Sequence, residues 1–147
     1  MNHQPQTPGP SAPDYNAIGY DIIGAAFRVY NTVGRLLREN YYEAALAYEL
    51  TQAGHTVQRQ VPVPALYKGE EVRDAYQADI IVDNCVIIEL KAVSTMKEAE
   101  SRQLLTYLRL SGFKLGYLIN FGTKTFKIGR SNDFPLSEGI YRFVNNL

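Results

Sequence analysis

The chain has 147 residues, which is enough for one domain with a substantial core and too few for two typical domains. Its 15 basic and 15 acidic residues cancel, and this balance disfavours a large non-specific footprint on nucleic acid while permitting a local one. A hydrophobic content of 46% with 12% aromatic residues is typical of a globular protein and excludes an extended disordered chain.

Three further features disfavour extracellular and membrane classes. Cys85 is the only cysteine, so neither a disulfide nor a cysteine-based zinc site can form within one chain, and a reducing compartment such as the cytoplasm is predicted. No run of about 18 apolar residues occurs, so we expect no membrane-spanning segment. The first residues lack the basic and apolar regions of a secretory signal.

The first part of the chain is predicted to be helical after a disordered tail. Residues 1–13 hold four prolines and are expected to be disordered, which leaves residues 14–147 as a single domain. Apolar residues at helical spacing predict a first helix that begins near residue 14 and ends or bends at Gly34. A second helix is predicted from about Glu39 to Ala53.

The apolar pattern then changes to that of strands, which are predicted over 57–63, 72–82, 85–90, 115–121 and 125–129. A helix is predicted between the third and fourth strands, with Thr95 and Glu98 as a possible capping box and Gly112 as its end. Because a helix joins those two strands, we expect them to be parallel, whereas the first three strands resemble an antiparallel meander. The predicted fold is α/β, a mixed sheet of about five strands between helices in three layers. Residues 140–144 are too short and ambiguous to assign.

Charged residues flank the apolar hairpin "DIIVDNCVIIELK", residues 79–91. Glu89 and Lys91 are two apart on a strand and therefore point to the same face, and Asp79 lies on the neighbouring strand at a similar height. Neighbouring carboxylates repel each other unless a cation lies between them, and Mg²⁺ or Mn²⁺ with oxygen ligands is such a cation. The alternative interpretation is ordinary, because acids and lysines often end strands.

The turn of this hairpin supplies an internal test. A two-residue turn, Asp83–Asn84, places Asp79 opposite Ile88 and so on the other face from Glu89. A three-residue loop that also includes Cys85 places Asp79 opposite Glu89. Metal chemistry requires the second arrangement.

Two helices carry additional polar candidates. Gln103 and Tyr107 are four residues apart on one face of the predicted third helix, near its apolar seam. Glu39 lies at the start of the second helix, where a carboxylate is favoured by the helix dipole. Taken singly, each residue is also compatible with an ordinary surface position.

These segments together resemble the GxxExxY protein family, a branch of the PD-(D/E)XK nuclease superfamily. The likeness covers residues 18–130 and is carried by these blocks: "LLRENYYEAALAYEL", "RQVPVPALYKG", "ADIIVDNCVIIELKAV", "QLLTYLRLSG" and "KLGYLINFG". The resemblance implies a restriction-endonuclease-like three-layer core. Two positions depart from the family pattern, since Leu36 replaces the naming glycine and Tyr30 stands where the family often has histidine.

The resemblance also implies residue roles. Asp79 and Glu89 match the metal-binding acids, and Lys91 matches the catalytic lysine. Glu39 matches a glutamate that reaches the metal directly or through water. Three further positions match the family pattern: Gln103 and Tyr107 match its QxxxY pair, and Tyr42 its naming tyrosine. Gln60 matches a family glutamine to which no role can be assigned.

The implied function is a Mg²⁺- or Mn²⁺-dependent nuclease that hydrolyses phosphodiester bonds of DNA or RNA, and neither nucleic acid is favoured. The alternative is a catalytically silent binding or adaptor module that keeps the same sheet as a scaffold. Its stacking or interface surfaces would be Tyr41, Tyr42, Tyr107 and Tyr117. A homo-oligomer or a partner protein is compatible with both. Retention of Asp79, Glu89, Lys91 and Gln103 together favours the enzyme.

Overall fold

The computed structural model describes residues 12–132 and 135–146, so the predicted disorder of the tail lies almost entirely outside the described residues. Three helices and five strands follow one another in the order α1 (Tyr15–Val33), α2 (Glu39–Gln52), β1 (Val57–Tyr67), β2 (Glu70–Val82), β3 (Val86–Lys91), α3 (Glu98–Ser111), β4 (Leu115–Asn120) and β5 (Ile140–Val144). Within the described part of the chain, none of the helices combines the length and the apolar character that crossing a membrane requires.

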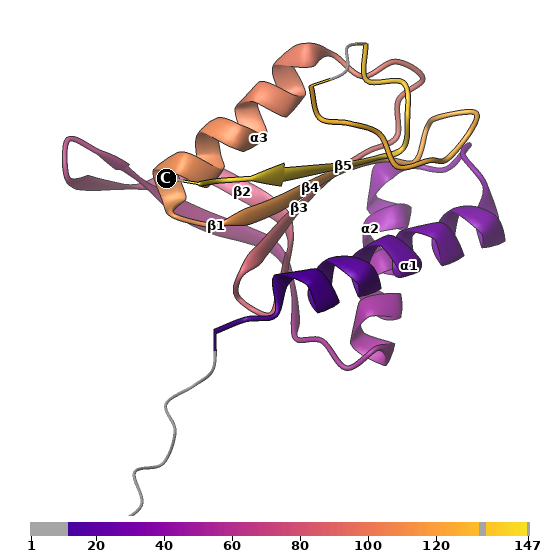
Figure 1. The fold of residues 1–147 in the computed structure, drawn as a ribbon, viewed down its shortest axis with the longest axis horizontal. Coiled ribbons are helices and arrows are strands. Elements are labelled where there is room, and N and C mark those ends of the chain that lie inside the picture. Colours follow the sequence, from indigo (N-terminus) through magenta and orange to yellow (C-terminus); the bar gives the residue numbers. More distant parts are fainter. Residues whose placement is uncertain (1–11, 133–134, 147) are drawn as a thin grey trace, which may run out of the picture.

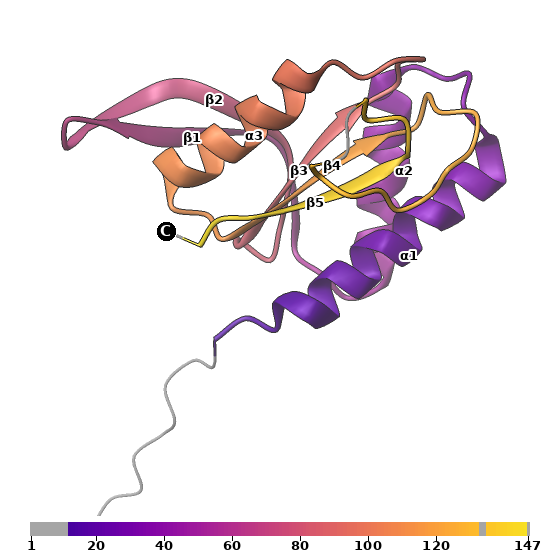
Figure 2. The same ribbon diagram turned by 45° about the horizontal axis from the view of Figure 1, so that its top comes forward.

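The five strands form one mixed sheet in the order β1-β2-β3-β4-β5. The pairs β1–β2, β2–β3 and β4–β5 are antiparallel, and β3–β4 is parallel. Helix α3 makes the crossover between the two parallel strands, as the sequence predicted. Figures 1 and 2 show α3 on one face of the sheet and α1 with α2 on the other, which confirms the three-layer mixed α/β fold.

Two apolar clusters separate the three layers. Alternating residues of β3 divide between them, because successive strand side chains point to opposite faces. Val86, Ile88 and Leu90 pack toward α1 and α2, and Ile87 packs toward α3. Glu89 and Lys91 therefore lie on the α3 face, as the alternation predicted.

The hairpin between β2 and β3 adopts the three-residue loop that the candidate site requires. Val82 pairs with Val86, and the register continues through Ile80 and Ile88. Asp83 and Asn84 have positive φ angles of 51° and 57°, the left-handed conformation that tight hairpin turns need and that Asp and Asn tolerate. The extra residue is Cys85. Continuation of this register brings Asp79 level with Glu89.

Two details of the predicted elements are wrong. Residues 125–129 are not a strand; only Ile128 forms an isolated bridge, with Ile140, and the fifth strand is β5. The bridge shows that this segment runs beside the sheet without the consecutive pairing that defines a strand. The capping box of Thr95 and Glu98 is also absent, because α3 begins at Glu98 and the Glu100 carboxylate accepts from the Lys97 N–H at 3.3 Å.

Candidate active site

The carboxylate pair, Asp79 and Glu89, lies where β2 and β3 separate. The last paired residues of the two strands are Ile80 and Ile88, although both strands continue. Beyond that point the Leu90 N–H donates to Asp79 Oδ2 at 2.8 Å, so the side chain of Asp79 replaces a main-chain partner. The Asp79 N–H donates to Glu89 Oε1 at 3.3 Å. The structure thus brings the two predicted acids together at one opening in the sheet.

The acids of this pair are short of compensating positive charge. Burial and, next to it, the charge of Asp79 raise the pKa of Glu89 to about 7. Burial also raises the pKa of Asp79, whereas the hydrogen bond from the Leu90 N–H lowers it. A cation between the two carboxylates would favour their ionised forms.

Lys91 and Gln103 share a small cavity with Glu89 of the carboxylate pair. The lining comes from β2, β3, β4 and α3: Tyr76, Glu89, Lys91, Glu100, Gln103, Leu104 and Leu118. Lys91 Nζ lies 4.0 Å from Glu100 Oε1, so a carboxylate that the sequence did not indicate shares the lysine's charge. The cavity brings a carboxylate, an ammonium group and an amide to one place on the α3 face.

Tyr76 contacts the site directly and was missed from sequence. Its hydroxyl donates to Glu89 Oε1, and its ring stacks on Tyr107 with centroids 4.3 Å apart and an interplanar angle of 14°. The predicted Tyr107 is therefore placed to support Tyr76. Burial and the negative charge of Glu89 raise the pKa of Tyr76, which keeps its hydroxyl protonated as a donor.

Gln60 and Glu43 form the second support of the carboxylate pair. Gln60 has a φ of 52° within β1, and its side-chain amide donates to Asp79 Oδ1 at 3.2 Å and also to Glu43. Glu43 is buried on α2 and accepts from Arg59 Nε at 3.0 Å. The role that sequence could not assign to Gln60 is thus to hold Asp79. Only the spacing of Glu43, four residues after Glu39 on the same helix, could have indicated its participation.

Glu39 begins α2 and is exposed, at the edge of the site. Desolvation raises its pKa, the positive charge of Lys91 opposes this, and the charge of Asp79 adds to it. No three or more His, Cys, Asp or Glu side chains in the described ranges are grouped so that they could hold a metal ion. Glu39 therefore does not complete a three-carboxylate ligand set with Asp79 and Glu89 in this structure.

Tyr42 is a core residue that shapes the turn before α2. It is fully buried, stacks on Phe121 at 4.5 Å, donates to Gly34 O at 2.6 Å and accepts from the Leu37 N–H at 3.2 Å. These bonds fix the α1–α2 connection despite the departure at Leu36, whose side chain is exposed.

The second departure, Tyr30, also has a structural place. Its hydroxyl donates to the main-chain oxygens of Thr123 and Lys124, at 2.8 and 3.0 Å. Its ring stacks on Phe126 with the centroids 4.5 Å apart. Tyr30 therefore connects α1 to the segment after β4, and its hydroxyl donates to main-chain oxygens of that segment rather than to Asp79 or Glu89.

The donor set fits a hard divalent cation. Oxygen ligands suit Mg²⁺ and Mn²⁺, and Mg²⁺ in phosphate-processing sites is commonly bound through one or two carboxylates, with waters and substrate oxygens completing its shell. Glu89 Oε1 accepts two hydrogen bonds, from Tyr76 and from the Asp79 N–H, which orient the carboxylate. Burial is the main cause of the raised pKa of both acids, and a bound cation would favour their ionised forms.

A family comparison shows the superfamily of the chain. The model of the PD-(D/E)XK nuclease superfamily matches residues 16–131. The chain belongs to the PD-(D/E)XK nuclease superfamily. PD-(D/E)XK nucleases generally use divalent metal ions, and membership indicates a nuclease that acts on nucleic acid. No curated protein and no solved structure matched the chain.

Proposed function

We propose that this PD-(D/E)XK domain is a Mg²⁺- or Mn²⁺-dependent nuclease of the GxxExxY branch, which hydrolyses phosphodiester bonds of DNA or RNA in the cytoplasm. The observation that carries the proposal is the meeting of Asp79 and Glu89 at the opening between β2 and β3, with Lys91 on the same face. Buried neighbouring acids of this kind destabilise a fold, and a bound cation is the physical reason to keep them together.

Each residue of the site has a distinct task in this proposal. Asp79 and Glu89 would hold the ion, which supplies an activated water and charge neutralisation at the phosphate. The ammonium group of Lys91 would stabilise the negative charge that develops on the phosphate oxygens. The amide of Gln103 would donate to a phosphate oxygen and so place the scissile group, and Glu39 would act through an intervening water.

The proposal is tested by cleavage of a panel of single-stranded DNA, duplex DNA and RNA with Mg²⁺ or Mn²⁺. We expect cleavage that EDTA abolishes and that Lys91→Ala lowers by about 10²-fold or more, the effect of removing one group that stabilises transition-state charge. Lys127→Ala, an exposed lysine outside the cavity, is the matched control and should cleave at the wild-type rate. Failure to cleave any of these substrates would favour the silent binding module instead. An undiminished rate in Lys91→Ala would reject the role proposed for that lysine.

A further inference from the structure

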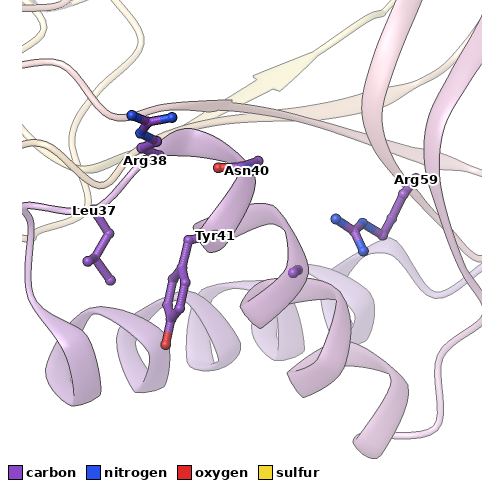
Figure 3. Close-up of a pocket in the computed structure, with 6 residues that line it drawn as sticks. Leu37, Arg38, Asn40, Tyr41 and Arg59 are labelled. Atoms are coloured by element: carbon purple, nitrogen blue, oxygen red, sulfur yellow. The ribbon is translucent and has the colours of Figure 1, made fainter.

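A hollow of about 520 Å³ lies beside the start of α2 and is separate from the cavity that Glu89 and Lys91 line. We call it the α2 hollow; it is lined by Leu37, Arg38, Asn40, Tyr41, Ala44 and Arg59. Figure 3 shows Leu37 and Tyr41 directed to the same side of the helix and Arg59 reaching toward α2 from β1. Its volume lies within the range of roughly 300–1,000 Å³ that is usual for small-ligand sites.

Tyr41 lines the α2 hollow, packs against a core residue and is still partly exposed to solvent. Tyr41 is 48% exposed, and its ring meets the buried Tyr42 edge to face, with centroids 6.2 Å apart and an interplanar angle of 86°. Tyr42 in turn stacks on Phe121 in the core. Tyr41 is therefore held from behind while much of its ring remains open to solvent, next to the 37% exposed Leu37. An exposed ring with an apolar neighbour is the usual platform for an unpaired base.

The polar groups of the α2 hollow are suited to a nucleotide. Arg38 and Asn40 are exposed beside Tyr41 and offer a cation and an amide. Arg59 is fixed by Glu43, with its Nη2 at 2.9 Å from Glu43 Oε2, so it is oriented and its charge is partly offset. Arg38 is consequently the stronger candidate for a phosphate contact.

The α2 hollow is linked to the carboxylate pair through hydrogen bonds, because Arg59 of the hollow and Gln60, which donates to Asp79, both donate to Glu43. On α2, Glu39 lies between Arg38 and Asn40, and its pKa responds to the charges of Lys91 and Asp79. On β1, Gln60 follows Arg59 and donates to Asp79 Oδ1 at 3.2 Å. A strand whose phosphate lies at the carboxylate pair would place a neighbouring nucleotide in the α2 hollow.

We propose that the α2 hollow binds an unstacked base of a single-stranded nucleic acid, next to the scissile phosphate. The base stacks on Tyr41 beside Leu37, and Arg38 contacts an adjacent phosphate. Because the bases of a duplex are already stacked on one another, this arrangement selects single strands over duplexes. The inference rests on the proposed nuclease function for its substrate and names the form of that substrate.

The test is fluorescence anisotropy in EDTA, with a labelled oligothymidylate, an oligouridylate and a blunt duplex. We expect both single strands to bind more tightly than the duplex, and Tyr41→Ala to weaken single-strand binding about fivefold or more, the lower end of the effect of losing a base–aromatic stack. The matched control is Tyr48→Ala, which removes a 62% exposed tyrosine of α2 outside the hollow and should bind as the wild type. Equal affinity of Tyr41→Ala and wild type, or preference for the duplex, overturns the proposal.

A second variant covers the case in which Tyr41→Ala does not fold. Arg38 is exposed, so Arg38→Ala should keep the wild-type melting temperature while the slope of log affinity against log salt falls by about 0.7, the value for one lost phosphate contact on a single strand. An unchanged slope and affinity in Arg38→Ala overturns the proposal. The binding assay contains no cleavage step. Cleavage by the wild type together with unchanged binding by the variants therefore rejects the α2 hollow alone, whereas weakened binding without any cleavage rejects the nuclease alone.

Discussion

Tyr76 determines the orientation of Glu89. Its hydroxyl bonds one oxygen of the carboxylate while its ring is fixed by Tyr107, so the position of Glu89 depends on a residue from the adjacent strand. Partners that orient metal-binding carboxylates commonly contribute 10- to 100-fold to metal affinity.

We predict that Tyr76→Phe weakens Mn²⁺ binding about tenfold, because the ring stack remains and only the bond to Glu89 is lost. Calorimetric titration measures the affinity, and a melting curve checks that the fold is intact. Tyr48→Phe removes an exposed hydroxyl elsewhere and should leave the affinity unchanged. Equal affinities in Tyr76→Phe and wild type would show that the hydroxyl has no part in the site.

Among single residues, those that follow from the alternation of one strand could be predicted from sequence. Those that reach the site through contacts between elements far apart in the chain were missed. Glu89 and Lys91 follow from the two-residue period of a strand. Tyr76 and Glu43 reach the site only because β1, β2 and α2 meet there, and no local spacing reports such a meeting. Tyr42, expected to support the site, is instead a buried residue of the α1–α2 turn.

The β2–β3 hairpin is the element on which the site depends most. Its three-residue loop fixes the register that brings Asp79 beside Glu89, and a shift by one residue would turn one acid to the opposite face. Asn84 sustains the turn at a φ of 57°, where a β-branched side chain is disfavoured.

We predict that Asn84→Val lowers the free energy of unfolding by about 1–2 kcal/mol, the usual penalty for a left-handed conformation. Asn84→Gly is the control and should be at least as stable as the wild type, because glycine adopts positive φ without a steric penalty. Both values come from urea denaturation. A Val variant as stable as the Gly variant would mean that the turn does not hold this conformation in solution.

At the element scale, the strands and helices with regular periodicity were predicted well. The exception was the final strand, because residues 125–129 carry β-forming residues but make only one isolated bridge. The pairing of β5 with β4 joins residues from Ile119 with Ile140, 21 positions apart, to Leu115 with Val144, 29 positions apart. Such pairing is decided by which edge of the sheet remains open rather than by local pattern. The two hairpin registers were also open from sequence, since loop length decides between them.

At the scale of the whole molecule, a half-buried histidine joins three segments at the end of the hairpin remote from the carboxylate pair. His55 Nδ1 lies 2.6 Å from Asp83 Oδ2, and its Nε2 lies 2.7 Å from Asp21 Oδ2. The contacts link α1, the α2–β1 connection and the β2–β3 turn. Burial lowers the pKa of His55, but the hydrogen bonds to Asp83 and Asp21 outweigh it, so the pKa is raised.

A raised pKa means that the folded state binds the proton more tightly than the unfolded state. The stability from His55 is therefore fully present below the unfolded pKa, about 6.5, and is lost as the pH rises through the higher folded pKa. We predict that the difference in unfolding free energy between wild type and His55→Gln shrinks as the pH rises from that of the unfolded pKa into the alkaline range.

Urea denaturation at a series of pH values measures this difference. Comparison with His55→Gln is necessary because the pKa of Glu89 is raised from 4.5 to about 7, so the stability lost through Glu89 as the pH rises between these values overlaps the start of the His55 window. The variant retains Glu89 and removes only the histidine contribution. A difference that is constant with pH, or that grows as the pH rises, contradicts the proposed charged bridge.

The sheet with helices on both faces could be predicted from sequence. The apolar periods of its strands and helices, together with the single crossover connection, are compatible with few arrangements of these elements. The contact of β1 and α2 with the site could not be predicted, because it depends on the positive φ of Gln60 and on the bonds of Gln60 to Asp79 and Glu43. A glutamine within a strand gives no local sign of such a conformation.

Calorimetric titration with Mn²⁺ measures directly whether Asp79 and Glu89 together bind a divalent ion. The wild type should show saturable binding, and Asp79→Ala should show none. Asp74→Ala, which removes an exposed acid from the same strand, should bind as the wild type. A flat trace for the wild type, or the same isotherm for Asp79→Ala and wild type, would contradict the account.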